Sequence, residues 1–118
     1  IFKDINNMKH LFVSYEIARE LKELGFDDKC LSYYLLGDLF IDERGSRNQN
    51  SIGVDCLAPL YQQVVDWFRE EHNIEIYVKQ SYKKDGVHGY INDSAVCFWL
   101  TYYEALDAVI LEAIKLIR

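Results

Sequence analysis

Residues 77–90 hold the first group of side chains whose types and spacing could do chemistry. In this stretch, YVKQSYKKDGVHGY, basic or titratable side chains are interleaved with tyrosines. Basic groups beside exposed aromatic rings are what a single-stranded nucleic acid or a phosphate backbone would contact. The candidate binding residues of the stretch are Tyr77, Lys79, Tyr82, Lys83, Lys84, His88 and Tyr90.

The charges around this stretch weaken the nucleic-acid interpretation. Glu75 and Asp85 reduce the formal charge of its three lysines from +3 to +1, and the whole chain of 118 residues carries −6. Nucleic-acid affinity depends largely on counterion release by clustered Lys and Arg. Lysines near a hairpin tip also protect a sheet edge from unwanted pairing. Two interpretations stay open: a solvated, edge-protecting hairpin and a nucleic-acid-binding one.

The sequence Glu70-Glu71-His72 invites a metal or general-base interpretation, because carboxylate and imidazole groups serve both roles. Its spacing argues against both. Adjacent helical positions point about 100° apart, and the chain contains no HExxH motif. A histidine near a helix C-terminus is more simply a favourable cation or cap. We therefore expect no metal site here.

Cysteine and histidine give no local catalytic pattern. No CxxC spacing, G-x-S-x-G, G-x-G-x-x-G or phosphate-binding loop motif is present. We predict no catalytic residues and no cofactor, and keep as an alternative a small enzyme whose Cys–His site is assembled by folding. The residues available to such a site are Cys30, Cys56, Cys97, His10, His72 and His88.

The composition favours one globular domain over residues 1–118. Half of the residues are hydrophobic and only one is proline, so the chain can bury a real core. The cysteine usage favours a reducing cytoplasm. No run approaches the roughly 20 apolar residues of a membrane helix, and no signal peptide opens the chain. We expect a cytoplasmic protein without a membrane partner.

Two segments lack a regular pattern. Residues 1–12 form a poorly defined N-terminal segment. Residues 42–55, DERGSRNQNSIGVD, form a polar loop, and loops of this length in compact domains are often functional or mobile. Its Arg44, Arg47 and Asn48 are weaker binding candidates.

The stretch from Ala58 to Lys79 organises the rest of the chain. Pro59 fits the first turn of a helix, where its missing N–H would have no partner. The hydrophobic period then changes after His72 from that of a helix to that of a strand. The predicted helix buries Leu60, Tyr61, Val64, Val65, Trp67 and Phe68, and the predicted strand buries Ile74, Ile76 and Val78.

Local signals place further elements on either side. Ser14 and Gly25 bound a helix as N-cap and left-handed C-terminal residue, and residues 30–41 read as strands broken near Gly37-Asp38. The Asp85-Gly86 pair predicts a hairpin over residues 75–92. The remaining predicted elements are a strand at 95–100 and a helix that begins with a capping box formed by Thr101 and Glu104.

The last helix is apolar on nearly all sides, so it must be covered on more than one side. Either it lies in the middle of the domain, or its surplus apolar face is a self-association surface that gives a homodimer. The candidate self-association residues are Tyr102, Leu106, Val109, Ile110, Ala113, Ile114 and Ile117.

Two helical segments and the C-terminal sequence resemble a family. The segments VSYEIARELKELGFDDKCLSYY, APLYQQVVDWFREEHNIEI and YYEALDAVILEAIKLI are similar to a group of small uncharacterised bacterial proteins, often phage-like or carried on mobile elements. The family has no established activity and no catalytic residues to carry over. The resemblance implies a small intracellular accessory protein.

We therefore predict an α+β fold, with one antiparallel sheet of about three to five strands and amphipathic helices on one face. The preferred function is a non-enzymatic protein-interaction module, of phage or mobile-element type, that binds another protein or itself. The alternatives are a nucleic-acid-binding accessory protein that uses the basic hairpin, and a small enzyme.

Overall fold

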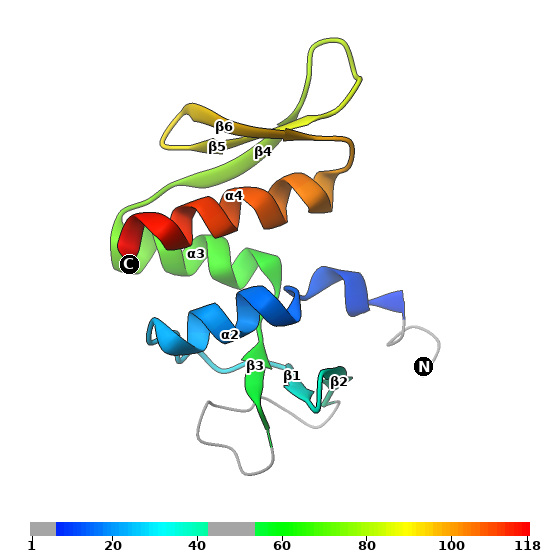
Figure 1. The fold of residues 1–118 in the computed structure, drawn as a ribbon, viewed down its shortest axis with the longest axis vertical. Helices are drawn as coiled ribbons and strands as arrows, with labels where there is room; N and C mark the ends of the chain where they lie inside the picture. Colours follow the sequence, from blue (N-terminus) through cyan, green and yellow to red (C-terminus); the bar gives the residue numbers. More distant parts are fainter. Residues whose placement is uncertain (1–6, 43–53) are drawn as a thin grey trace. The chain divides into compact units, whose positions relative to one another are not determined.

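The computed structural model describes residues 7–42 and 54–118. It confirms the α+β class, and its strands form two three-stranded antiparallel sheets where one had been expected. The chain forms two compact units, residues 1–62 and 63–118, which are described in turn (Figure 1). Most of the predicted 42–55 loop, with its candidates Arg44, Arg47 and Asn48, lies outside the described residues.

The first unit begins with a short 3₁₀ helix, η1 (Lys9–Leu11), and continues into helix α2 (Tyr15–Glu23). The Ser14 hydroxyl accepts a hydrogen bond from the Ile17 N–H at 3.3 Å, as expected of an N-cap. Gly25 has a φ of 93°, and the Phe26 N–H donates to the Leu21 carbonyl at 2.9 Å. This is the predicted Schellman ending of the helix.

Strands β1 (Ser32–Leu35), β2 (Asp38–Ile41) and β3 (Cys56–Ala58) form the first sheet in the order β2-β1-β3. Leu36 and Gly37 connect β1 to β2 with φ values of 52° and 84°, which is the geometry of a two-residue hairpin turn. The predicted break near Gly37 is confirmed. Strand β3 was not predicted, because its three residues are too few to show a period.

The segment around Pro59 differs from the sequence prediction. Helix α3 (Tyr61–His72) begins two residues after Pro59. The Pro59 carbonyl instead accepts a hydrogen bond from the Val13 N–H at 3.0 Å, and Leu60 forms an antiparallel bridge with Phe12. The extended backbone that this pairing needs is also the conformation preceding a helix N-terminus. The proline therefore precedes the helix.

The second unit continues α3 into strands β4 (Ile76–Gln80), β5 (Val87–Ile91) and β6 (Ser94–Trp99) and ends in helix α4 (Tyr102–Ile117). The strands follow one another as an antiparallel meander in the order β4-β5-β6. This arrangement confirms the predicted hairpin and the predicted third strand. Figure 1 shows the three strands stacked along one side of α4.

Helix α4 starts at the predicted cap. The Thr101 hydroxyl oxygen accepts from the Glu104 N–H at 3.3 Å, and the hydroxyl group donates to the Glu104 carboxylate at 2.8 Å. The close fit of the helix to the sheet depends on Gly89. A Cβ at that position would lie 2.6 Å from the Cys97 Sγ and 2.9 Å from the Val109 Cβ, so only glycine lets β5 approach α4 this closely.

The predicted self-association face of α4 is buried. The buried side chains cover about half of the helix circumference at 100° per residue. Of the seven candidates, Tyr102 is exposed and Ile117 is half-buried, so only these two retain accessible surface. The self-association surface predicted on α4 is therefore wrong for the five buried candidates, because the fold itself covers the surplus apolar face. They are Leu106, Val109, Ile110, Ala113 and Ile114.

None of the helices in the described part of the chain has the length and apolar character needed to cross a bilayer.

Candidate functional site

The strand register gathers aromatic side chains on the face of the β4-β5-β6 sheet that points away from α4. Tyr77 pairs with Tyr90, and His88 lies between Lys79 on β4 and Phe98 on β6. Paired residues project from the same side of a sheet. The intervening Gly89 approaches Val109 of α4, so the five paired residues occupy the opposite side. We call this side the outer face.

The rings on the outer face form a continuous row. Tyr77 and Tyr90 are stacked, with ring centroids 4.7 Å apart and an interplanar angle of 8°. His88 lies 6.2 Å from Tyr90 and 4.7 Å from Phe98 between ring centroids. These four residues, the aromatic row, connect all three strands. Side-chain contacts across neighbouring strands are the unit that stabilises a sheet.

The Tyr77 end of the row is held by an acidic residue. The Tyr77 hydroxyl donates to Asp93 Oδ1 at 3.0 Å, from the turn between β5 and β6. Desolvation, together with the hydrogen bond to Asp93 and its negative charge, raises the pKa of the Tyr77 phenol. The phenol is therefore neutral at physiological pH, and the charge at this end of the row is that of the Asp93 carboxylate.

Three predicted binding residues do not lie on the outer face. Tyr82, Lys83 and Lys84 lie in the connection between β4 and β5 and are exposed to solvent. The Ser81 hydroxyl organises the start of this loop by accepting from the Asp85 N–H at 3.2 Å and donating to the Asp85 carboxylate. The structure thus brings four of the seven candidates together on the outer face and leaves the other three on the loop.

The sequence did not reveal the contribution of β6. Its side chains are exposed along most of its length, and its Phe98 completes the aromatic row. The exposed apolar surface continues past the strand into the start of α4. The exposed fractions are 41% for Val96, 45% for Phe98, 46% for Trp99, 77% for Leu100 and 53% for Tyr102. We call these five residues the β6 patch.

The charges of the sheet are balanced. Three lysines lie on β4 and its loop, and Glu75, Asp85 and Asp93 lie at the ends of the same strands. The contact between Tyr77 and Asp93 places one of these carboxylates directly against the row. The formal charge of this region is therefore zero, which gives no excess of cations for a phosphate backbone.

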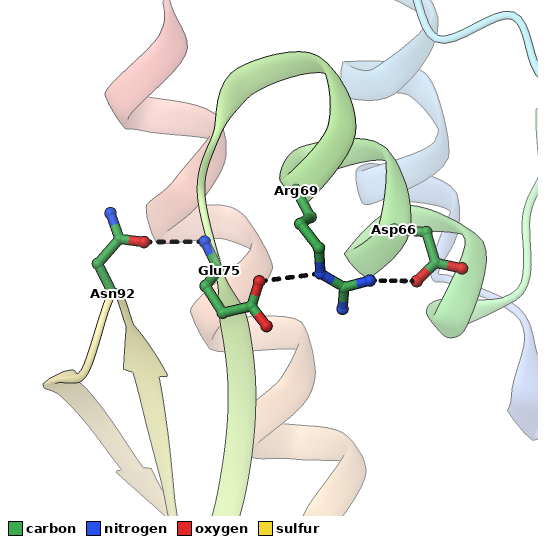
Figure 2. A network of polar contacts seen from close by, with 4 residues as sticks. All are labelled: Asp66, Arg69, Glu75 and Asn92. Atoms are coloured by element: carbon green, nitrogen blue, oxygen red, sulfur yellow. Dashed lines mark hydrogen bonds and ion pairs between the residues drawn. The ribbon is translucent and has the colours of Figure 1, made fainter.

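Figure 2 shows how the sheet is tied to the end of α3. Arg69 forms ion pairs with Asp66 at 3.2 Å and with Glu75 at 2.9 Å. The Asn92 side-chain oxygen accepts from the Glu75 N–H at 2.9 Å. The hydrogen bond and charge of Glu75 raise the pKa of Arg69. These exposed contacts fix the start of β4 between α3 and the β5–β6 turn, which is a positioning role.

The Glu70-Glu71-His72 sequence lies at the end of α3. The His72 ring contacts the Trp67 ring with centroids 4.7 Å apart, which matches a structural role for this histidine. Among residues 7–42 and 54–118, no group of three His, Cys, Asp or Glu side chains could hold a metal ion.

The cysteines are poor nucleophiles. Burial raises the pKa of Cys30 to about 12 and that of Cys56 to about 11. Desolvation also raises the pKa of Cys97, whose thiol contacts the Ala105 carbonyl at 3.6 Å. Because the thiolate is the nucleophile, these thiols are protonated and unreactive near neutral pH. The raised pKa values therefore give no support to a cysteine nucleophile.

In comparisons with protein-family models, with curated proteins and with solved structures, nothing matches this chain. The resemblance to phage-like bacterial proteins therefore stays a prediction.

Proposed function

We propose that this protein is a non-enzymatic interaction module that binds another protein chain through the β4-β5-β6 sheet. The observation that carries the proposal is the β6 patch beside the aromatic row. Together they place apolar and aromatic side chains on the outer face, along β6 and at the start of α4. Large apolar side chains exposed together in one segment are typical of interaction sites in soluble proteins.

The chemistry of the surface supports a protein partner. Tyr, Trp and Phe are enriched at the centres of protein interfaces, and charged residues are depleted there. The β6 patch contains Phe98, Trp99 and Tyr102 and no charged residue. The carboxylates, Lys83 and Lys84 lie at the strand ends and on the loop, as in the polar rim of an interface. Lys79 lies on the outer face, opposite His88.

Two features disfavour a nucleic-acid partner. Single-stranded binding sites combine an electropositive groove with ring faces that are free to stack on bases. Here Tyr77 and Tyr90 cover one face of each other, and the carboxylates of the region offset its lysines. We therefore expect the double variant Lys83→Glu with Lys84→Glu to bind the partner nearly as well as wild type.

The test is capture of a partner by the immobilised full chain from a nuclease-treated lysate of its source cell. The test variant carries Tyr77→Thr and Tyr90→Thr, because threonine keeps the strand propensity while removing the rings. The matched control carries Tyr33→Thr and Phe40→Thr, which removes a similar stacked pair, with centroids 5.6 Å apart, from the other sheet.

The proposal expects a defined protein retained by the wild-type chain and by the control, and lost with the test variant. Equal capture by the test variant would place binding elsewhere. Recovery of nucleic acid from an untreated lysate, lost after Lys83→Glu with Lys84→Glu, would overturn the proposal in favour of the nucleic-acid alternative.

A further inference from the structure

Strand β6 is an open edge of its sheet. In the order β4-β5-β6 its partner is β5 alone. Within the described residues, no hydrogen bond from its other side to a further segment is found. An edge strand presents unpaired N–H and C=O groups, which makes it a template for pairing with another strand.

The two edges of this sheet differ in their protection. β4 carries Lys79, and its connecting loop carries two more lysines, which is the usual device against edge pairing. β6 reads SAVCFW and contains neither a charge nor a proline. Its one protective feature is a bulge, in which Val96 is the extra residue between the Ala95–Tyr90 and Cys97–Gly89 pairs. Beyond the bulge the strand continues through Cys97, Phe98 and Trp99.

We propose that β6 pairs with β6 of a second copy of this chain, antiparallel and about a two-fold axis, to give a continuous six-stranded sheet. This inference rests on the proposed function and names its partner. In a two-fold interface the same patch must be complementary to itself. Because β6 is uncharged and apolar, no register places like charges opposite each other within it.

The remaining charges allow the pairing. If the axis passes through Val96, that residue faces its own copy and Asp93 faces Trp99 of the second copy. The two Asp93 carboxylates are then separated by six strand positions, or roughly 20 Å. This distance exceeds the Debye length of about 8 Å at physiological ionic strength. At this distance the two Asp93 carboxylates are largely screened from each other.

The apolar area is sufficient for a dimer. A fully exposed aromatic side chain offers about 200 Å², and the five residues of the β6 patch are each between two-fifths and four-fifths exposed. Together they present on the order of 500 Å² per copy, on both faces of the sheet. If the paired copies cover all five residues, they bury on the order of 1,000 Å², the lower bound for a specific interface. The backbone of the paired strands adds to this area.

The test is sedimentation velocity of the full chain over a wide concentration range, with charged substitutions at Val96. Val96 lies in mid-strand, so each register near the centre brings it close to its own copy. Val96→Lys and Val96→Glu should each raise the dimer dissociation constant roughly a hundredfold, since juxtaposed like charges cost several kcal/mol. An equimolar mixture of the two variants should associate again, because opposite charges then face each other.

The matched controls are Leu116→Lys and Leu116→Glu. Leu116 is an apolar residue of the same unit, 64% exposed and on α4, so its substitution should leave the dimer unchanged. Circular dichroism of every variant checks that the fold is retained. The β6 pairing would be overturned if Val96→Lys dimerised with the wild-type dissociation constant. It would also be overturned if the mixture of Val96→Lys and Val96→Glu stayed monomeric.

The outcome also separates this inference from the proposed function. A wild-type chain that is monomeric at all concentrations, yet captures a different protein through the aromatic row, would overturn the self-pairing and leave the interaction module standing. A monomeric chain that captures no protein would overturn both.

Discussion

The rings of Tyr77 and Tyr90 lie almost parallel, 4.7 Å apart across β4 and β5, and the Tyr77 hydroxyl is bonded to Asp93 in the next turn. Each tyrosine therefore depends on the other for its position. Replacing either by Thr should lower the melting temperature by roughly 3–8 °C, from the loss of the aromatic pair. The second replacement should cost clearly less than the first, because the pair is already broken. Additive losses in a double-mutant cycle would show that the stacking is not energetically coupled.

Gly89 is the point of closest approach between β5 and α4. Gly89→Ala should lower the free energy of unfolding by about 1–3 kcal/mol, because its Cβ collides with the Cys97 Sγ and the Val109 Cβ. Urea denaturation measures the effect. Adding Cys97→Ala should restore part of the loss, since it removes one of the two obstacles. A neutral Gly89→Ala would mean that the helix can move away from the sheet freely.

The buried thiols predict a stability that falls at alkaline pH. Burial raises the pKa of Cys30 to about 12 from an ordinary value of 9.0, and that of Cys56 to about 11. Above pH 9 the unfolded chain loses these protons while the folded chain keeps them, so folding becomes less favourable as pH rises from about 9 towards 12. Below about pH 8 the thiols are protonated in both states and contribute no slope.

The urea midpoint measured at several pH values checks this prediction. The variant with Cys30→Ala and Cys56→Ala provides the comparison, because lysines and tyrosines titrate alike in both proteins. The variant should lose less stability than wild type between pH 8 and pH 10.5. Parallel curves would show that the two thiols are solvated in the folded protein. At pH 8 a thiol reagent should also react with both residues only after unfolding.

Each helix cap contributes separately to stability. Ser14→Ala removes the acceptor of the Ile17 N–H, and Thr101→Ala removes that of the Glu104 N–H. Each should cost about 1 kcal/mol of unfolding free energy, and the equivalent Gly variants only a few tenths, since glycine exposes the helix end to water. Equal losses for Ala and Gly would point to a different role of the side chain. Thermal unfolding of the four variants measures this.

The sequence predicted the elements whose signals are local. The caps at Ser14 and Thr101, the turn at Gly37 and the hairpin closed at Gly86 depend on residue types within a few positions. The predicted start of α3 was wrong because the Pro59 carbonyl accepts a hydrogen bond from the Val13 N–H, a contact between residues that are distant in the sequence. A local pattern cannot contain such a contact.

The candidate site was predicted only in part, and the bulge at Val96 explains why. The turn at Asn92-Asp93 pairs Ile91 with Ser94. Counting onward without a bulge would place Cys97 opposite His88 and turn Phe98 towards α4. The bulge shifts the register by one residue, so that Phe98 faces His88 and joins the aromatic row. Likewise, α4 is apolar on nearly all sides, so its sequence alone does not show which of its side chains become buried.

The reciprocal bonds between Glu75 and Asn92 have a consequence for folding kinetics. Each residue donates its backbone N–H to the other, Glu75 to the Asn92 side chain and Asn92 to the Glu75 carbonyl, both at 2.9 Å. They close the open end of a meander in which each strand pairs with its neighbour in sequence. Such a sheet needs few long loop closures before its contacts form. The second unit should therefore complete its structure early, by zipping outward from its two turns.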